Sequence, residues 1–383
     1  MYIFLTVFLT LYGGMHWYWY RKAMPIVSHS AGARVVLGLL LIVMVLAPIM
    51  IRVLERWGYE AAARWTACIG YSWMGILFLS CSCFLVLDLA RLLTWSAGRF
   101  GAAGLDRFLP GPAVSFTTIT TLTAFVFAYG LYEAAEIRTE TVDLYSTKIP
   151  VGAGTLTVAQ ISDVHLGLLV GEERLREILT AVRRAAPDIL VATGDLVDGQ
   201  MDGRGGLIAL LQEIRPRYGK FAVTGNHELY VGSTQALSFL RDAGFTVLCG
   251  EAITIPGLLA VAGVDDPVFG GKAGVAAQER EALQKVAHDR FVLLLKHRPV
   301  ISAASRGRFD LQLSGHVHQG QIFPFGLLTR LAFPLPTGLS GIEEGGAVYV
   351  SRGAGTWGPP IRFLAPPEVT VFRLRHPQAQ PGR

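Results

Sequence analysis

Four long runs of residues without a charged side chain lie in the first third of this chain. A helix needs roughly 17–25 apolar residues to cross a bilayer, and each run has about that length. The first run ends in the aromatic cluster Trp17–Tyr20, followed by Arg21 and Lys22, which is typical of a membrane interface. The sequence therefore predicts a transmembrane region over residues 1–136, with helices at about 2–20, 35–52, 66–88 and 111–132.

The composition supports a membrane-integral protein. Hydrophobic residues make up 51% and charged residues 16% of the 383 residues, whereas roughly a quarter of the residues are charged in soluble proteins. The net charge of +5 does not indicate a nucleic-acid partner, because no run of Lys and Arg interleaved with aromatic residues accompanies it. Positive residues directly after the first helix predict an extracytoplasmic amino terminus and, after four crossings, an extracytoplasmic C-terminal domain.

The character of the sequence changes after the fourth run. Residues 137–154 carry mixed charge and a proline, which predicts a linker. Residues 155–375 alternate short β-rich apolar runs with helical patterns, and such alternation predicts an α/β domain. One helical pattern places its apolar side chains at Leu175, Ile178, Leu179 and Val182. The polar residues 376–383 predict a disordered tail.

Residue types that bind metals follow directly after the predicted strands of this domain. Open α/β sheets place ligand sites at these carboxyl ends. The residues that follow the predicted strands are Asp163, His165, Asp195, Asn226, His227, Glu228, His297, His316 and His318. A single histidine is more often a core or surface residue, but the complete set predicts a metal site. Mixed oxygen and nitrogen donors suit manganese, iron or zinc, and the ligands exceed one tetrahedral site, so two ions are expected.

The motifs D-x-H, G-D-x-x-D, G-N-H-E, a lone H and G-H-x-H occur in this order between Thr155 and Leu374. In this order they resemble the calcineurin-like metallophosphoesterase superfamily. With its four predicted spans, the chain is similar to transmembrane proteins with a metallophosphoesterase domain, in the branch of the bacterial proteins YkuE and YaeI. The resemblance implies a four-layer α/β/β/α sandwich in a bacterial cell membrane. It also implies an enzyme that hydrolyses phosphodiester or pyrophosphate bonds with a metal-bound hydroxide.

The resemblance further implies a role for each matching residue. One divalent ion would be held by Asp163, His165 and His318, the other by Asn226, His297 and His316, with Asp195 bridging both. His227 would face the substrate phosphate, where it can stabilise charge or protonate the leaving oxygen. Asp198 and Glu228 would orient ligand imidazoles, with a solvated carboxylate as an equal alternative for either. Manganese is the expected metal, and iron, zinc and magnesium are alternatives.

Two features bear on the substrate. Gln319 stands where the branch more often has glycine, so it is expected to narrow the pocket or add an amide contact. Residues 321–341 form an apolar loop with Arg330 as the only charge, which either dips into the bilayer or folds onto the protein. By resemblance to hydrolases of UDP-diacylglucosamine, the expected substrate is a membrane lipid or a nucleotide lipid. A soluble phosphodiester substrate and a non-catalytic membrane sensor are the alternatives, and the oligomeric state stays open.

Overall fold

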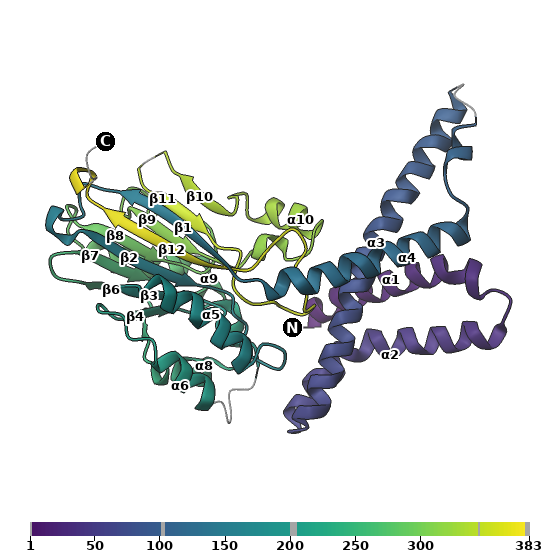
Figure 1. The fold of residues 1–383 in the computed structure, drawn as a ribbon, viewed down its shortest axis with the longest axis horizontal. Helices are drawn as coiled ribbons and strands as arrows, with labels where there is room; N and C mark the ends of the chain where they lie inside the picture. The colour runs from purple at the N-terminus through teal and green to yellow at the C-terminus, as the bar shows by residue number, and fades with distance from the viewer. Residues whose placement is uncertain (1, 101–103, 200–204, 344, 380–383) are drawn as a thin grey trace. The chain divides into compact units, whose positions relative to one another are not determined.

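The computed structural model describes residues 2–100, 104–199, 205–343 and 345–379. Its internal contacts divide the chain into two compact units. The helical unit comprises Met1–Tyr132 with Gly358–Ile361, and the C-terminal unit comprises Glu133–Trp357 with Arg362–Arg383. Figure 1 shows the long helices of the first unit and the sheets of the second.

The helical unit consists of long helices. Its elements are α1 (Tyr2–Val27), α2 (Ala31–Arg56), α3 (Glu60–Arg99), the 3₁₀ turn η1 (Leu105–Phe108) and α4 (Pro112–Ala135), whose last turn extends into the C-terminal unit. Within the described residues, the three helices α2, α3 and α4 are long and apolar enough to cross a membrane. The fourth expected span coincides with α1, which is not among these three helices.

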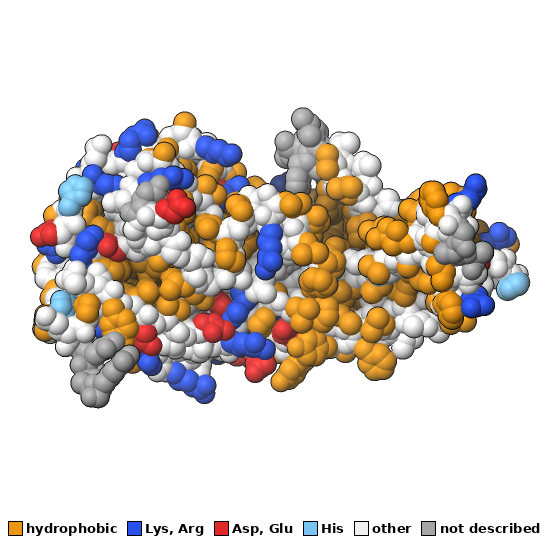
Figure 2. All heavy atoms as spheres, turned by 90° about the horizontal axis from the view of Figure 1, so that it is seen from above, with side chains coloured by type: hydrophobic (Ala, Val, Ile, Leu, Met, Phe, Trp, Pro, Cys, Tyr) orange, Lys and Arg blue, Asp and Glu red, His pale blue; other side chains and the backbone are white. Residues whose placement is uncertain are grey.

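A close backbone approach and a few polar side chains join these helices. A Cβ atom at Gly70 of α3 would stand 2.8 Å from the Ala47 Cβ of α2, so this approach requires a small residue. The Lys22 Nζ of α1 lies 2.5 Å from Asp88 Oδ1 of α3, and the Tyr18 hydroxyl donates to the same carboxylate at 2.7 Å. In Figure 2, hydrophobic side chains cover much of the visible surface of these helices.

The C-terminal unit is built on two six-stranded sheets. Across the first sheet the strands are β1 (Arg138–Tyr145), β12 (Glu368–Arg375), β2 (Thr155–Ile161), β3 (Ile189–Thr193), β4 (Lys220–Val223) and β5 (Thr246–Val247). Across the second they are β10 (Gly338–Gly341), β11 (Ala347–Val350), β9 (Leu311–Ser314), β8 (Phe291–Leu295), β7 (Leu259–Gly263) and β6 (Glu251–Thr254). Strands β2 to β5 run parallel to one another, as do β11, β9, β8 and β7.

The segment expected as a linker, residues 137–154, contains strand β1. This strand pairs in parallel with β12 over its whole length, from Arg138 opposite Glu368 to Tyr145 opposite Arg375. Its residues alternate between exposed and half-buried positions, the pattern of an edge strand with one solvated face. Three of its eight residues are charged, and this concealed the strand in the sequence. Only Glu136 and Ile137 separate it from α4.

Three hydrophobic clusters stabilise the C-terminal unit. The first packs strands β2, β3 and β4 against α5 (Glu172–Ala185), α6 (Gly205–Gln212) and α8 (Ser233–Asp242). The second draws its side chains from both sheets. The third packs strands β7 and β8 against α9 (Pro267–Gln284). The apolar side chains at helical spacing on α5, from Leu175 to Val182, are fully buried, as a period of 3.6 residues predicts.

Short helical elements complete the C-terminal unit. They are η2 (Val151–Ala153), α7 (Asn226–Val231), η3 (His318–Gly320), α10 (Phe325–Ala332) and η4 (Pro377–Ala379). Two of them, α7 and η3, begin at expected metal ligands. Of the expected disordered tail, residues 377–379 form η4, and residues 380–383 lie outside the described residues.

Candidate metal centre

The expected ligands follow strands of both sheets. In the first sheet, β2 leads to Asp163 and His165, β3 leads to Asp195, and β4 leads to Asn226. In the second sheet, β8 leads to His297, and β9 leads to His316 and His318. Because parallel strands end at the same edge of a sheet, each sheet carries its share of these side chains along one edge.

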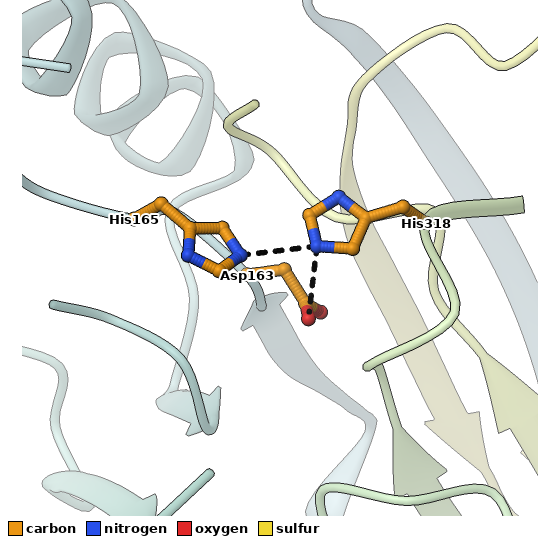
Figure 3. Close-up of side chains that lie close together, drawn as sticks. All are labelled: Asp163, His165 and His318. Carbon is orange, nitrogen blue, oxygen red and sulfur yellow. Dashed lines mark hydrogen bonds and ion pairs between the residues drawn. The ribbon is translucent and has the colours of Figure 1, made fainter. Parts of the chain in front are cut away.

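The first group of possible metal ligands consists of Asp163, His165 and His318. Their donor atoms all lie within 4.8 Å of one another. The His318 Nε2 atom is 3.0 Å from His165 Nε2 and 3.4 Å from Asp163 Oδ1. Figure 3 shows the two imidazole rings and the carboxylate pointing toward a common point. All three residues are buried, so the group is shielded from competing water.

A second group consists of Asp195, His297 and His316. The His297 Nε2 atom lies 3.2 Å from Asp195 Oδ2 and 3.1 Å from His316 Nδ1. A third group, made of His165, Asp195 and His227, shares one residue with each of the other two. The three groups therefore form one continuous cluster of donor atoms.

Asn226 contributes an acceptor to this region. Its Oδ1 atom is buried and accepts no hydrogen bond from any described residue. A buried acceptor without a partner costs about 1–3 kcal/mol, and a cation removes that cost. The neighbouring His227 backbone N–H donates to Asp195 Oδ1 at 2.8 Å, which places Asn226 beside the second group. The donor chemistry of the cluster thus fits divalent metal ions.

The backbone at the cluster is strained. Asp163, His165, Asp195, His316 and His318 all have positive φ angles, between 47° and 71°. Side chains other than glycine adopt this left-handed region at a cost of order 1–3 kcal/mol. A Cβ atom at Gly225 would lie 2.2 Å from Asp195 Oδ1, so only glycine fits beside that carboxylate. Such strain persists where the surrounding structure fixes it, and it concentrates at functional sites.

Comparison with known proteins identifies the family of this chain. Residues 156–320 match the model of the calcineurin-like phosphoesterase family. An uncharacterised metallophosphoesterase of Aquifex aeolicus (strain VF5) is 43% identical over 251 residues, which are 65% of this chain and 95% of that protein. The chain belongs to the calcineurin-like metallophosphoesterase family. It is therefore a phosphoester hydrolase.

Two further relatives extend the comparison. The uncharacterised metallophosphoesterase YkuE of Bacillus subtilis (strain 168) is 30% identical over 263 residues, covering 65% of this chain and 90% of that protein. The transmembrane protein with metallophosphoesterase domain of Danio rerio is 30% identical over 267 residues, covering 66% of this chain and 61% of that protein. The family and branch expected from the motifs are confirmed.

Hydrogen bonds orient the imidazoles of this metallophosphoesterase. The His297 Nδ1–H donates to the Thr193 carbonyl at 2.9 Å, and the His227 Nδ1–H donates to Asp198 Oδ1 at 2.7 Å. The other carboxylate oxygen of Asp198 lies 3.8 Å from His165 Nδ1. Each contact leaves the opposite ring nitrogen directed into the cluster, which is how partner groups fix ligand histidines.

Glu228 acts on backbone rather than on an imidazole. Its carboxylate accepts hydrogen bonds from the N–H groups of Asp195, Leu196 and Gly225, at 3.0, 2.8 and 2.7 Å. The sequence interpretation left two roles open for it, orienting a ligand imidazole or being a solvated carboxylate. The side chain is instead buried, because the sharp turn after β3 leaves amides that need an acceptor. Burial and the nearby Asp195 carboxylate raise the pKa of Glu228 to about 7. The residue holds together the two loops that carry Asp195 and Asn226.

The electrostatics of the cluster keep two imidazoles neutral. Burial and the neighbouring His227 and His318 lower the pKa of His165 to about 3. Burial and His297 likewise lower the pKa of His316 to about 3. Metals bind the neutral imidazole, so these two rings are ready to bind. At His297, by contrast, burial is outweighed by the Asp195 carboxylate, which raises the pKa to about 10.

Arg362 is a site residue that the sequence interpretation missed. Its side chain is fully buried. It donates to the carbonyl oxygens of Arg352 at 2.7 Å and of Gly355 at 3.0 Å, and its Nη2 atom lies 3.2 Å from His318 Nδ1. A charged residue within the apolar stretch Pro360–Leu364 was the available signal. Arg362 ties the loop after β11 to His318, one of the expected ligands.

Replacing Arg362 by methionine is expected to destabilise the C-terminal unit by several kcal/mol, since each buried carbonyl left without a donor costs about 1–3 kcal/mol. Thermal unfolding of the detergent-solubilised chain measures the effect. The matched control is Arg280→Met, because Arg280 is exposed, and it should unfold at the wild-type temperature. Equal unfolding temperatures for the two variants would show that Arg362 does not stabilise this loop.

Proposed function

We propose that this metallophosphoesterase holds two divalent ions, with manganese as the preferred metal. One ion is assigned to Asp163, His165 and His318, the other to Asn226, His297 and His316, and Asp195 to both. The observation that carries the proposal is the overlap of the donor groups, since His165 and Asp195 each belong to two of them. A cluster with this many donors exceeds the coordination needs of a single ion.

When bound, a pair of ions supplies a deprotonated water at neutral pH and neutralises charge on the phosphoryl oxygens. The protein's own contribution is to hold seven donor side chains in place and to position His227. Burial lowers the pKa of His227, but its hydrogen bond to Asp198 outweighs burial and raises the pKa above its ordinary value. A protonated His227 suits a group that stabilises the phosphate charge or donates a proton to the leaving oxygen.

Metal removal tests the two-ion proposal. Dialysis of the purified full chain against a chelator is expected to abolish hydrolysis of bis(p-nitrophenyl) phosphate, and added Mn²⁺ is expected to restore it. Metal analysis of the restored protein should give two ions per chain. A restored enzyme with one ion per chain would contradict the two-ion assignment while leaving the hydrolase activity intact.

We also infer four membrane spans, including α1, and a C-terminal unit that forms a four-layer α/β/β/α sandwich on the extracytoplasmic side of a bacterial cell membrane. The 26-residue length of α1 and its ion pair with α3 support the fourth span. The three hydrophobic clusters support the layering. Protease added to intact spheroplasts is expected to degrade the C-terminal unit, and complete protection would contradict this sidedness.

The proposed substrate is a phosphodiester or pyrophosphate of a membrane lipid or a nucleotide lipid. The apolar helices and the apolar residues next to the metal cluster support this class over a soluble diester or a sensor without turnover. Purified enzyme in mixed micelles is expected to hydrolyse a UDP-linked diacyl lipid faster than a soluble phosphodiester. If the enzyme hydrolyses the lipid no faster than the soluble phosphodiester, the proposed preference for a lipid substrate is wrong.

A further inference from the structure

Helix α10 carries a water-exposed apolar surface in the C-terminal unit. We call this the α10 surface, and it consists of Phe323, Phe325, Leu327, Leu328 and Leu331. No residue of α10 is buried, and the Leu331 side chain is 83% exposed. A helix at the surface of a soluble protein buries its apolar face and exposes polar residues. A contiguous apolar surface of this kind marks a place of contact with lipid or protein.

Arg330, the charged residue of α10, favours lipid over a protein partner. Arg330 is exposed and forms no hydrogen bond or ion pair with the described residues. An apolar helix with an unpaired cation matches the helices that lie in the membrane interface, where apolar side chains enter the acyl region and basic ones meet lipid phosphates. A protein partner would need an acidic counterpart buried beside apolar side chains, which is costly.

The α10 surface lies beside the end of α4, the last of the apolar helices. Leu364 joins the two: its backbone N–H donates to Glu133 Oε2 of α4 at 2.8 Å, and its side chain lines the same cavity as Phe323 and Leu327. Arg174 donates to the carbonyls of Ala134 and Ala135 at 2.6 and 2.8 Å. These bonds lie within the C-terminal unit, to which Glu133–Ala135 belong, and they hold this turn beside Leu364 and Arg174.

The connection between α4 and β1 is too short to let these two elements move far apart. Two residues separate α4 from β1, so they span at most about 7 Å. The C-terminal unit begins at Glu133, within the last turn of α4, and Leu364 connects that turn to the α10 surface.

From these contacts we propose that the α10 surface rests in the headgroup and upper acyl region of the bilayer, with Arg330 against lipid phosphates. The inference rests on the membrane anchoring proposed above and not on the identity of the substrate. It also gives a lipid-borne ester a route to the metals. A cavity of about 140 Å³ lies between α10 and the turn that carries the ligands, lined by Gln319 and Phe333 among others. The Phe333 ring stands 5.0 Å from the ring of His316.

Fluorescence quenching in proteoliposomes tests the contact. The full chain, with its four native cysteines replaced by alanine, receives Leu331→Cys labelled with an environment-sensitive nitrobenzoxadiazole dye. It is then reconstituted into phosphatidylcholine and phosphatidylglycerol vesicles. The control is Val151→Cys, since Val151 is 55% exposed and follows the far end of β1, a strand about 25 Å long.

Lipids with brominated acyl chains are expected to quench the dye at position 331 and not at position 151, whereas aqueous iodide should quench only position 151. Iodide quenching at position 331 would overturn the proposal. Protection of position 331 from both quenchers would also overturn it, because protein would then cover the surface.

A double variant, Leu328→Glu with Leu331→Glu, separates this proposal from the substrate proposal. It should hydrolyse bis(p-nitrophenyl) phosphate at the wild-type rate and lose about tenfold or more of its rate on a diester carried in vesicles. A tenfold loss of rate corresponds to about 1.4 kcal/mol in the activation free energy. An unchanged vesicle rate in this variant would contradict the bilayer contact. The wild-type enzyme could fail to hydrolyse vesicle-borne esters while brominated lipid still quenches the dye at position 331. The substrate proposal would then be wrong, and the bilayer contact of the α10 surface would be supported.

Discussion

Asp195→Asn is expected to lower kcat/KM for bis(p-nitrophenyl) phosphate by about 10²–10³-fold, the loss typical of removing one charge-stabilising group from a transition state. Asp195 lies within reach of both His165 and His297 and belongs to two of the three donor groups. The substitution keeps the shape of the side chain and removes its negative charge. It therefore weakens the binding of any cation at this position. Metal analysis should find fewer than two ions per chain.

The structural role of Asp195 needs its own control. Its Oδ1 atom accepts the His227 backbone N–H, and the asparagine carbonyl oxygen can accept the same bond, so the variant should unfold near the wild-type temperature. Asp289→Asn, at an exposed position, serves as the matched charge change and should be fully active. Undiminished turnover of Asp195→Asn would refute the placement of the metal centre.

The positions of the site residues could be predicted because each one is tied to a local pattern. Asp163 and His165 follow a β-rich apolar run, and the structure ends β2 at Ile161, two residues before the aspartate. Parallel strands then bring distant segments to the same edge by geometry alone. Helix α5 was equally predictable, since its four apolar side chains repeat with the helical period and all of them are buried.

Residues whose role depends on long-range contacts could not be predicted. Strand β1 forms because it pairs with β12, more than two hundred residues later in the sequence. Its charged sequence alone predicts a linker. Arg362 reaches His318 across 44 positions of sequence, and nothing in its neighbours marks the carbonyls that surround it. Glu228 looks like a partner for an imidazole, but the amides left free by the turn at Asp195 receive its carboxylate instead.

The apolar loop shows the limit most clearly. Its composition is compatible both with contact to lipid and with packing onto the protein, and the helical period does not distinguish the two. The proposed lipid contact rests instead on the exposure of Leu331 and on the hydrogen bond between Glu133 and the Leu364 amide. Both depend on tertiary structure, since Glu133 and Leu364 are 231 positions apart in the sequence.

His227→Ala is expected to reduce kcat by about 10²–10⁴-fold, the range for loss of a general acid, while the metal content stays at the wild-type level. The His227 ring lies 4.6 Å from the ring of His165 and is oriented by Asp198. Asp198→Asn removes the carboxylate charge but leaves the His227 ring in the site, so it should cost about 10–100-fold, as is usual for a partner of a functional histidine. Undiminished turnover in both variants would contradict a role of His227 in hydrolysis.

The leaving group distinguishes the two roles open to His227. A p-nitrophenolate leaves without protonation, whereas an alkoxide needs a proton as the bond to phosphorus breaks. If His227 donates that proton, His227→Ala loses far more activity on an alkyl phosphodiester than on bis(p-nitrophenyl) phosphate. This is the expected result, because the hydrogen bond to Asp198 raises the pKa of the His227 imidazole. Equal losses on both substrates would show that His227 acts through its charge on the phosphate. Tyr230→Phe is a suitable control for both substrates. The Tyr230 ring stands 5.3 Å from that of His227, and phenylalanine keeps this aromatic contact, so the variant should retain full activity.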